Sequence, residues 1–123
     1  MPSIQRPLSG DILVFELEAE RERATDPELI RRSGRNARTL LKDGPLRVTL
    51  VVLGPGGELA EHRAAGPITV QVLEGRIRIG AGDEEHHLGP GQLLAAGPGI
   101  RHWVASDDGA TFLLTVAHPE RVE

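Results

Sequence analysis

From residue 37 onward, short apolar runs alternate with breaks that contain glycine. Val, Leu, Ile and Ala dominate the runs, and Asp-Gly, Gly-Pro and Glu-Gly pairs separate them. Runs of this length between turn residues are typical of β-strands. Strands at this spacing indicate a β-sandwich or a β-barrel, and the pattern alone leaves the choice open. The predicted strands are residues 37–41, 46–53, 59–63, 68–73, 76–79, 84–88, 93–96, 102–106 and 111–117.

The first 45 residues have fewer glycines and a denser pattern of charges. Residues 12–17 carry strand-forming side chains, whereas residues 16–23 are mostly helix formers, so this stretch is ambiguous. Residues 25–34 predict a short helix, because Pro27 suits a first turn and Gly34 can end the helix after two arginines. No repeat or low-complexity linker interrupts the sequence, so we expect one domain over residues 1–123.

Composition narrows the class of protein further. A chain of 123 residues is the usual size of one compact domain. Phe15, Phe112 and Trp103 are its only aromatic residues, so the core must be aliphatic. The absence of cysteine excludes a disulfide scaffold, a thiolate zinc site and a cysteine nucleophile.

The charge pattern argues against nucleic-acid and membrane partners. The formal net charge is −4, and no basic stripe of the kind that binds nucleic acid is present. No apolar run approaches 18 residues, and the first residues lack the apolar segment of a signal peptide. We therefore expect a cytoplasmic protein.

Two sequence motifs, each made of two short segments that contain glycine, carry a family resemblance. The first motif begins with Gly56 and reaches His62 after five residues, and it closes with the Val-Leu-Glu-Gly sequence of residues 72–75. The second opens with Leu-Gly-Pro-Gly at residues 88–91 and reaches His102 three residues after Gly99. Together they resemble the two motifs of the cupin family. The resemblance implies an all-β double-stranded β-helix, or jelly-roll, barrel over residues 46–117, preceded by an arm (residues 1–45) with a short helix and the first strand.

The departures from the family pattern concern its metal ligands. Metal-binding cupins resemble one another in using two histidines and a glutamate from the first motif and one histidine from the second. His62 and His102 match the first and last of these positions. Ala64 stands at the second histidine position and Ile68 at the glutamate position, and neither side chain can ligate a metal. The resemblance therefore implies that at least half of the metal site is missing.

A mostly apolar site around two histidines is the first expectation. Alternation along a strand places Ala64 on the face of His62, and it places Ile68 and Val70 together on the next strand. A barrel mouth of this kind would hold a compact apolar or weakly polar molecule. The predicted ligand-binding residues are His62, His102, Ala64, Ile68 and Val70.

A divalent metal is the alternative occupant. Catalytic zinc generally takes three protein ligands, and non-haem iron oxygenases take two histidines with a carboxylate, so His62 and His102 alone give neither set. His86 is a candidate for a further ligand, because it shares a strand face with the apolar Leu88. Without such a ligand, the two histidines are hydrogen-bonded residues of a barrel mouth.

Three functions of different kinds follow from this pattern. The leading one is a module that binds or senses a small ligand; the others are a metal-dependent isomerase or oxygenase, and a structural or interaction protein with a filled barrel. No residue can be assigned a catalytic role. A homodimer is expected from the resemblance to small cupins, with Gln71 and Trp103 as candidate interface residues.

Overall fold

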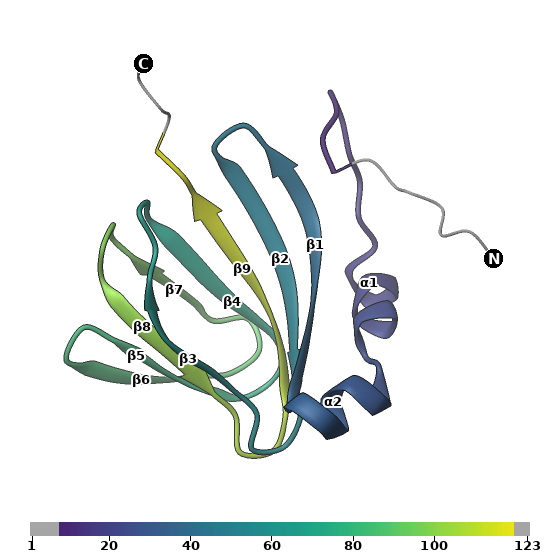
Figure 1. Cartoon of the computed structure of the whole chain (residues 1–123), viewed down its shortest axis with the longest axis vertical. Helices are drawn as coiled ribbons and strands as arrows, with labels where there is room; N and C mark the ends of the chain where they lie inside the picture. Colours follow the sequence, from purple (N-terminus) through teal and green to yellow (C-terminus); the bar gives the residue numbers. More distant parts are fainter. Residues whose placement is uncertain (1–7, 120–123) are drawn as a thin grey trace.

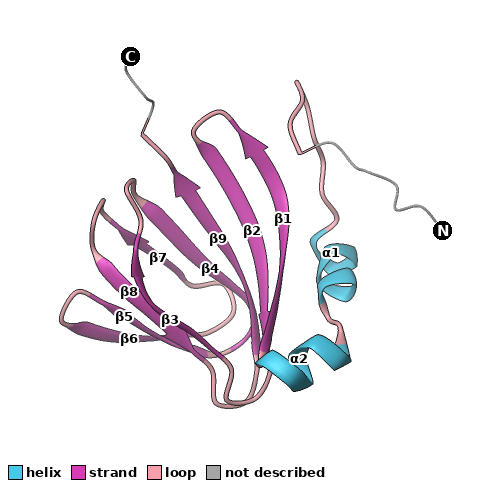
Figure 2. Cartoon of the chain, in the orientation of Figure 1, coloured by secondary structure: helices cyan, strands magenta, loops and turns pink. Residues whose placement is uncertain are grey.

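The computed structural model describes residues 8–119, which form two short helices and nine β-strands (Figures 1 and 2). Each predicted strand is present, with ends that differ by at most two residues from the prediction. The elements are α1 (Leu17–Ala24), α2 (Pro27–Ser33), β1 (Arg35–Asp43), β2 (Leu46–Leu53), β3 (Glu58–Arg63), β4 (Ile68–Gly75), β5 (Ile77–Ala81), β6 (Glu84–Leu88), β7 (Leu93–Ala96), β8 (Arg101–Ala105) and β9 (Ala110–Ala117).

The strands form two antiparallel sheets that face one another (Figure 1). The five-stranded sheet has the order β1-β2-β9-β4-β7, and the four-stranded sheet has the order β3-β8-β5-β6. Alternate residues of each strand point into the space between the sheets, where Phe112 is completely buried among aliphatic side chains such as Val70 and Ile79. The all-β fold and the aliphatic core expected from the sequence are confirmed. Within residues 8–119, no helix has the length and apolar character that crossing a bilayer requires.

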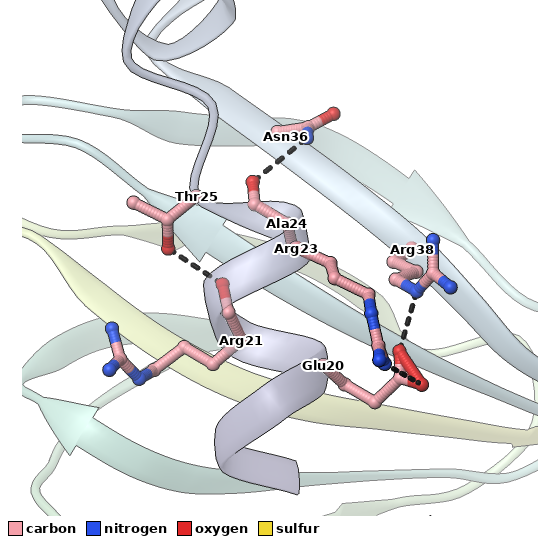
Figure 3. A network of polar contacts seen from close by, with 7 residues as sticks. All are labelled: Glu20, Arg21, Arg23, Ala24, Thr25, Asn36 and Arg38. Atoms are coloured by element: carbon pink, nitrogen blue, oxygen red, sulfur yellow. Dashed lines mark hydrogen bonds and ion pairs between the residues drawn. The ribbon is translucent and has the colours of Figure 1, made fainter. Parts of the chain in front are cut away.

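The N-terminal arm covers part of the outer face of the five-stranded sheet. Ala24 of α1 packs there with Leu40 and Leu50, and this outer cluster is separate from the barrel core. Beside it, the buried carboxylate of Glu20 lies 2.5 Å from Nε of Arg38 on β1 and 3.2 Å from Nη1 of Arg23 (Figure 3). A buried carboxylate requires such partners, because leaving it unpaired costs several kcal/mol. Asn36 also donates a hydrogen bond to the carbonyl of Ala24, which further fixes α1 on β1 (Figure 3).

The structure resolves the ambiguous N-terminal stretch. Residues 17–24 are helical, so the helix formers prevail over the strand-forming residues before them, and residues 12–15 belong to no strand. The predicted second helix is confirmed. The side chain of Asp26 caps its first turn, and Gly34 ends it with a φ of 80°.

Four glycines join the N-terminal arm to the barrel at one end of the molecule. The N–H of Gly54 donates to the carbonyl of Gly34, and the N–H of Gly57 donates to the carbonyl of Gly54. The N–H of Gly56 donates to the carbonyl of Ser106, and the N–H of Ser106 donates to the carbonyl of Gly57. These contacts, here called the glycine junction (Gly34, Gly54, Gly56, Gly57 and Ser106), connect the β2–β3 turn to the end of β8 and to the start of β1.

Adding one methyl group at the junction should therefore destabilise the fold. A Cβ at Gly57 would collide with the carbonyl oxygen of Gly34 and would lie 2.9 Å from that of Gly54, and both are backbone atoms that cannot rotate away. We expect Gly57→Ala to lower the free energy of unfolding by about 1–3 kcal/mol, the usual cost of overpacking. Gly97→Ala is the matched control, because a Cβ added there would meet no atom within 4 Å. Chemical denaturation of both variants measures the difference, and equal stability of the two would contradict the role of the junction.

Candidate functional site

A β-bulge in β3 brings His62 opposite His102. Leu59 pairs with Val104 and His62 pairs with His102, so three steps along β3 match two steps along β8. Leu59 and His62 are three residues apart, so strict alternation would place them on opposite faces of the strand. The extra residue of the bulge lets both face the same side of the sheet as their partners on β8. Strict alternation from Leu59 would have placed Glu61 there instead. Both histidines lie at the end of their strands remote from the glycine junction, which is here called the barrel mouth.

The two imidazole rings contact each other directly. Nε2 of His62 lies 2.8 Å from Nε2 of His102, and the ring centroids are 4.0 Å apart in an edge-to-face arrangement. Nδ1 of His62 lies 2.9 Å from the carbonyl oxygen of Ala60, and Nδ1 of His102 lies 3.1 Å from that of Ile100. The structure thus brings together His62 and His102, the two residues that match the first and last ligand positions in the motif resemblance.

The pair makes three close contacts: two between an Nδ1 and a carbonyl oxygen, and one between the two Nε2 atoms. Two neutral imidazoles carry only two N–H hydrogens, one fewer than these contacts need. A carbonyl oxygen only accepts, so each Nδ1 must carry the hydrogen that it donates, and a neutral imidazole has only one N–H. The two Nε2 atoms of His62 and His102 then face each other with lone pairs. At this separation a proton between the two atoms would complete the contact, whereas a cation or a donor group of a ligand would require the rings to move apart.

Burial disfavours the protonation of His102. The His102 side chain is 3% exposed, and this desolvation, the largest effect, lowers its pKa below the ordinary value of 6.5. The hydrogen bond to the Ile100 carbonyl acts in the opposite direction, and the neighbouring His62 lowers the pKa further. His62 itself is exposed at the mouth. Burial therefore favours the neutral form of His102, while His62 is the solvent-exposed member of the pair.

The apolar residues predicted for the site lie on its barrel side. Ile68 and Val70 are buried in the core between the sheets, and the half-buried Ala64 packs against the same cluster. The carbonyl of Ala64 accepts a hydrogen bond from Gly99 N–H, which ties β3 to the loop before His102. These aliphatic residues give the mouth no further hydrogen-bonding side chain.

His86 lies on a different wall of the barrel. Its Nε2 is 3.0 Å from a carboxylate oxygen of Glu84, two residues away on the same face of β6. His87 forms the equivalent pair with Glu85 on the opposite face. The four residues therefore form two separate pairs on opposite faces of β6.

A groove between the edges of the two sheets begins next to the histidine pair. It has a volume of about 470 Å³, and its lining is mostly aliphatic, with His86 and Glu84 at one side. Ile100, whose carbonyl holds His102, and Ala81, the strand partner of His102, belong to its wall. Sequence reasoning missed this groove, because it depends on how β6 and β7 approach in space. The full lining is Ala81, Glu84, His86, Leu88, Leu93, Leu94, Ala95, Ala96 and Ile100.

The donor set does not fit the metal that the fold family commonly holds. Within residues 8–119, no group of three or more His, Cys, Asp or Glu side chains could hold one ion. Only the Nε2 atoms of His62 and His102 converge, and Ala64 and Ile68 offer no donor atoms. The four-ligand site of metal-binding cupins is thus incomplete in this chain.

Ser106, which directly follows β8, has a structural role. It is 1% exposed, and its hydroxyl donates to the carbonyl of Arg76 while accepting from the N–H of Gly109. Both contacts lie at the junction end of the barrel. Ser106 therefore stabilises the turns at that end and does not contribute to the mouth.

Fold and motifs together define the class of this protein, a small double-stranded β-helix barrel with histidines at its mouth. A family model described as a cupin domain matches residues 49–117, and the chain belongs to the cupin family. The comparison with curated proteins gives no match. The match to the family model confirms the cupin resemblance that the sequence motifs indicated.

Solved structures agree with this assignment. A conserved protein of unknown function from Streptococcus pyogenes is 28% identical, with a TM-score of 0.68, and the match covers 73% of this chain and 79% of that one. A protein from Thermus thermophilus is 25% identical over 86% of this chain and 98% of its own, also with a TM-score of 0.68. A cupin-2 domain protein from Shewanella frigidimarina has the same TM-score at 15% identity, covering 85% and 95%, and supports the fold alone.

The lowered pKa of His102 predicts a specific dependence of stability on pH. Below about pH 6.5 the unfolded chain takes up a proton at residue 102 that the folded chain resists, so folding stability should fall as the pH is lowered through this value. His102→Asn should flatten that decline, whereas His87→Asn, on an exposed strand position, should keep it. Denaturation at pH 7.5 and 5.5 compares the three proteins, and identical slopes for parent and His102→Asn would refute the assignment.

Proposed function

We propose that this cupin binds a compact, largely apolar small molecule at the barrel mouth, with His62 and His102 receiving a donor group of the ligand. The observation that carries the proposal is the contact between two Nε2 atoms at 2.8 Å that have no hydrogen between them when both rings are neutral. If the exposed ring of His62 moves away from His102, a hydroxyl or amino group of the ligand could enter between the rings and donate a hydrogen to one Nε2. The apolar remainder would lie against Ala64 and along the groove past Ile100.

The surroundings support an apolar ligand over a charged one. Small-molecule sites are typically concave, mostly apolar and provided with a few polar groups that fix orientation. The groove beside the mouth is lined mainly by aliphatic residues, and the contact between Glu84 and His86 supplies polar groups at its edge. A sensing role without catalysis is consistent with this set, since no nucleophile or acid–base pair other than the histidines is assigned at the mouth.

A metal-dependent enzyme is the second candidate, favoured by one specific observation. Histidines that bind metals usually donate the other ring nitrogen to a carbonyl or a carboxylate, and both His62 and His102 have this anchoring. Two such ligands alone should bind a divalent ion weakly. The two proposals therefore differ in the metal content of the purified protein.

One sample can decide between the two candidates. We expect protein purified without chelator or metal-affinity resin to contain clearly less than one metal per chain by elemental analysis. In a thermal-shift screen of small alcohols and amines, any compound that stabilises the parent should lose its effect in His62→Ala but keep it in His87→Ala. Near-stoichiometric metal that disappears in His62→Ala would favour the enzyme. A screen without any stabilising compound, in a metal-free protein, would favour a filled structural barrel.

Restoring the missing ligands tests the positions of Ala64 and Ile68. Ala64→His with Ile68→Glu should bind zinc or nickel much more tightly than the parent, with one metal per chain. Without metal it should melt at a lower temperature, because Ile68 is 3% exposed and a buried unpaired carboxylate costs several kcal/mol. Metal at a hundredfold excess over its dissociation constant should return about 2.7 kcal/mol.

Calorimetry on the parent, both single variants and the double variant provides the comparison. Each single variant should bind metal less tightly than the double variant, because each adds only one ligand. A double variant that folds but binds no more tightly than the parent would show that positions 64 and 68 do not face the histidine pair.

A further inference from the structure

We propose that the cleft between the start of β5 and the β8–β9 turn is a second ligand site, which binds a small zwitterion with a carboxylate and an ammonium group. The cleft has a volume of about 360 Å³ and opens on the outer side of the four-stranded sheet. It shares no lining residue with the barrel mouth or with the groove beside it, so the proposal goes beyond the function proposed above and does not depend on the histidine pair. It is here called the outer cleft, and its charged or titratable side chains are Arg76, Arg78, His87, Asp107 and Asp108.

Two arginines supply the positive charges of the outer cleft. Arg76 directly precedes β5 and Arg78 follows two positions later, so alternation places both on the outer side of the sheet while Ile77 between them is buried in the core. His87 on β6 is the strand partner of Arg78 and lies on the same face, where its Nε2 contacts Glu85. The guanidinium groups are therefore the groups of the cleft that match an anion.

The turn between β8 and β9 adds carboxylates to the same cleft. Asp107 and Asp108 line it beside the arginines, and both are exposed. Asp107 accepts a hydrogen bond of 3.1 Å from Nη2 of Arg78. The guanidinium of Arg78 also lies 5.9 Å from the centroid of the Trp103 ring, which packs on Gly80 of the same sheet. Arg78 is thus fixed within the chain by an ion pair and by an aromatic ring.

One cation and one anion of the outer cleft have no charged partner in the chain. Within residues 8–119, no ion pair involves Arg76 or Asp108. The Arg76 guanidinium lies over Gly89 instead, because a Cβ added there would be 2.6 Å from its Nη1. The two groups have opposite signs and line one concave surface, so a single molecule with both charges can pair with both at once.

The buried hydroxyl of Ser106 fixes the two sides of the outer cleft relative to each other. It donates to the carbonyl of Arg76 and accepts from the N–H of Gly109, so one side chain joins the start of β5 to the β8–β9 turn. The carbonyl of Asp107 also accepts from the N–H of Gly56 in the glycine junction. The backbone on both sides is therefore held before a ligand enters, which lowers the entropy lost on binding.

The mixture of charges selects a zwitterion over a simple ion. A ligand with only a negative charge would meet Arg76 but also the carboxylates of Asp107 and Asp108, and a ligand with only a positive charge would meet both arginines. In a zwitterion the carboxylate pairs with Arg76, whose guanidinium suits bidentate contact, and the ammonium group pairs with Asp108. Free α-amino acids and short ω-amino acids share this chemistry and differ in the separation of the two charges.

Titration calorimetry of the full chain tests the site with glycine, β-alanine and γ-aminobutyrate, whose charges lie progressively further apart. Acetate and ethylamine are the control probes, because each carries only one of the two charges. We expect at least one zwitterion to bind and both control probes to bind about tenfold more weakly, since each makes only one of the two charged contacts. No binding of any zwitterion at millimolar concentration, or equal binding of acetate or ethylamine, would overturn the proposal.

Variants then locate the bound zwitterion. Arg76→Gln and Asp108→Asn should each weaken its binding about tenfold, because each loses one charged contact. Arg32→Gln and Asp43→Asn are the matched controls, since both residues are exposed and lie outside the outer cleft. His62→Ala should bind the zwitterion as the parent does, which separates this site from the barrel mouth. Binding that survives both cleft substitutions, or that is lost in His62→Ala, would overturn the proposal.

Discussion

The glycine junction is the constraint on which the arrangement of the barrel depends. Its hydrogen bonds fix the β2–β3 turn against the end of β8, so β3 enters the four-stranded sheet at one defined position. Gly57 can approach the carbonyl of Gly34 only because it has no side chain. From that fixed start, the bulge in β3 determines that His62 faces His102. Packing at one end of the molecule thus sets the chemistry at the other.

The histidine pair keeps one feature of a metal site although other ligands are missing. Two ring orientations are fixed by backbone carbonyls, which is the arrangement of metal ligands, while aliphatic residues replace the remaining donors. Burial keeps the pKa of His102 low and disfavours an added proton. The proposed function rests on this pair of imidazoles beside a groove lined mainly by aliphatic residues, which would suit an apolar molecule that carries a donor group.

The two sheets differ in how they meet their surroundings. The four-stranded sheet presents charged side chains such as Arg78 and Glu85 to solvent. The five-stranded sheet is covered on one half by the arm, with the buried Glu20 and Arg38 pair as an anchor, and remains uncharged on the other half (Figure 3).

The sequence by itself determined the strands, the second helix and the family. Short apolar runs between glycines are local signals, and the motif spacing around His62 and His102 is a property of the chain alone. It also predicted that Ala64 and Ile68 remove metal ligands. Only the tertiary structure decided that residues 17–24 are helical, because their packing on β1 and β2 outweighs an ambiguous local preference. The bulge between Leu59 and His62, the direct ring contact and the groove at β6 and β7 likewise depend on strand register, which arises from contacts between residues distant in sequence.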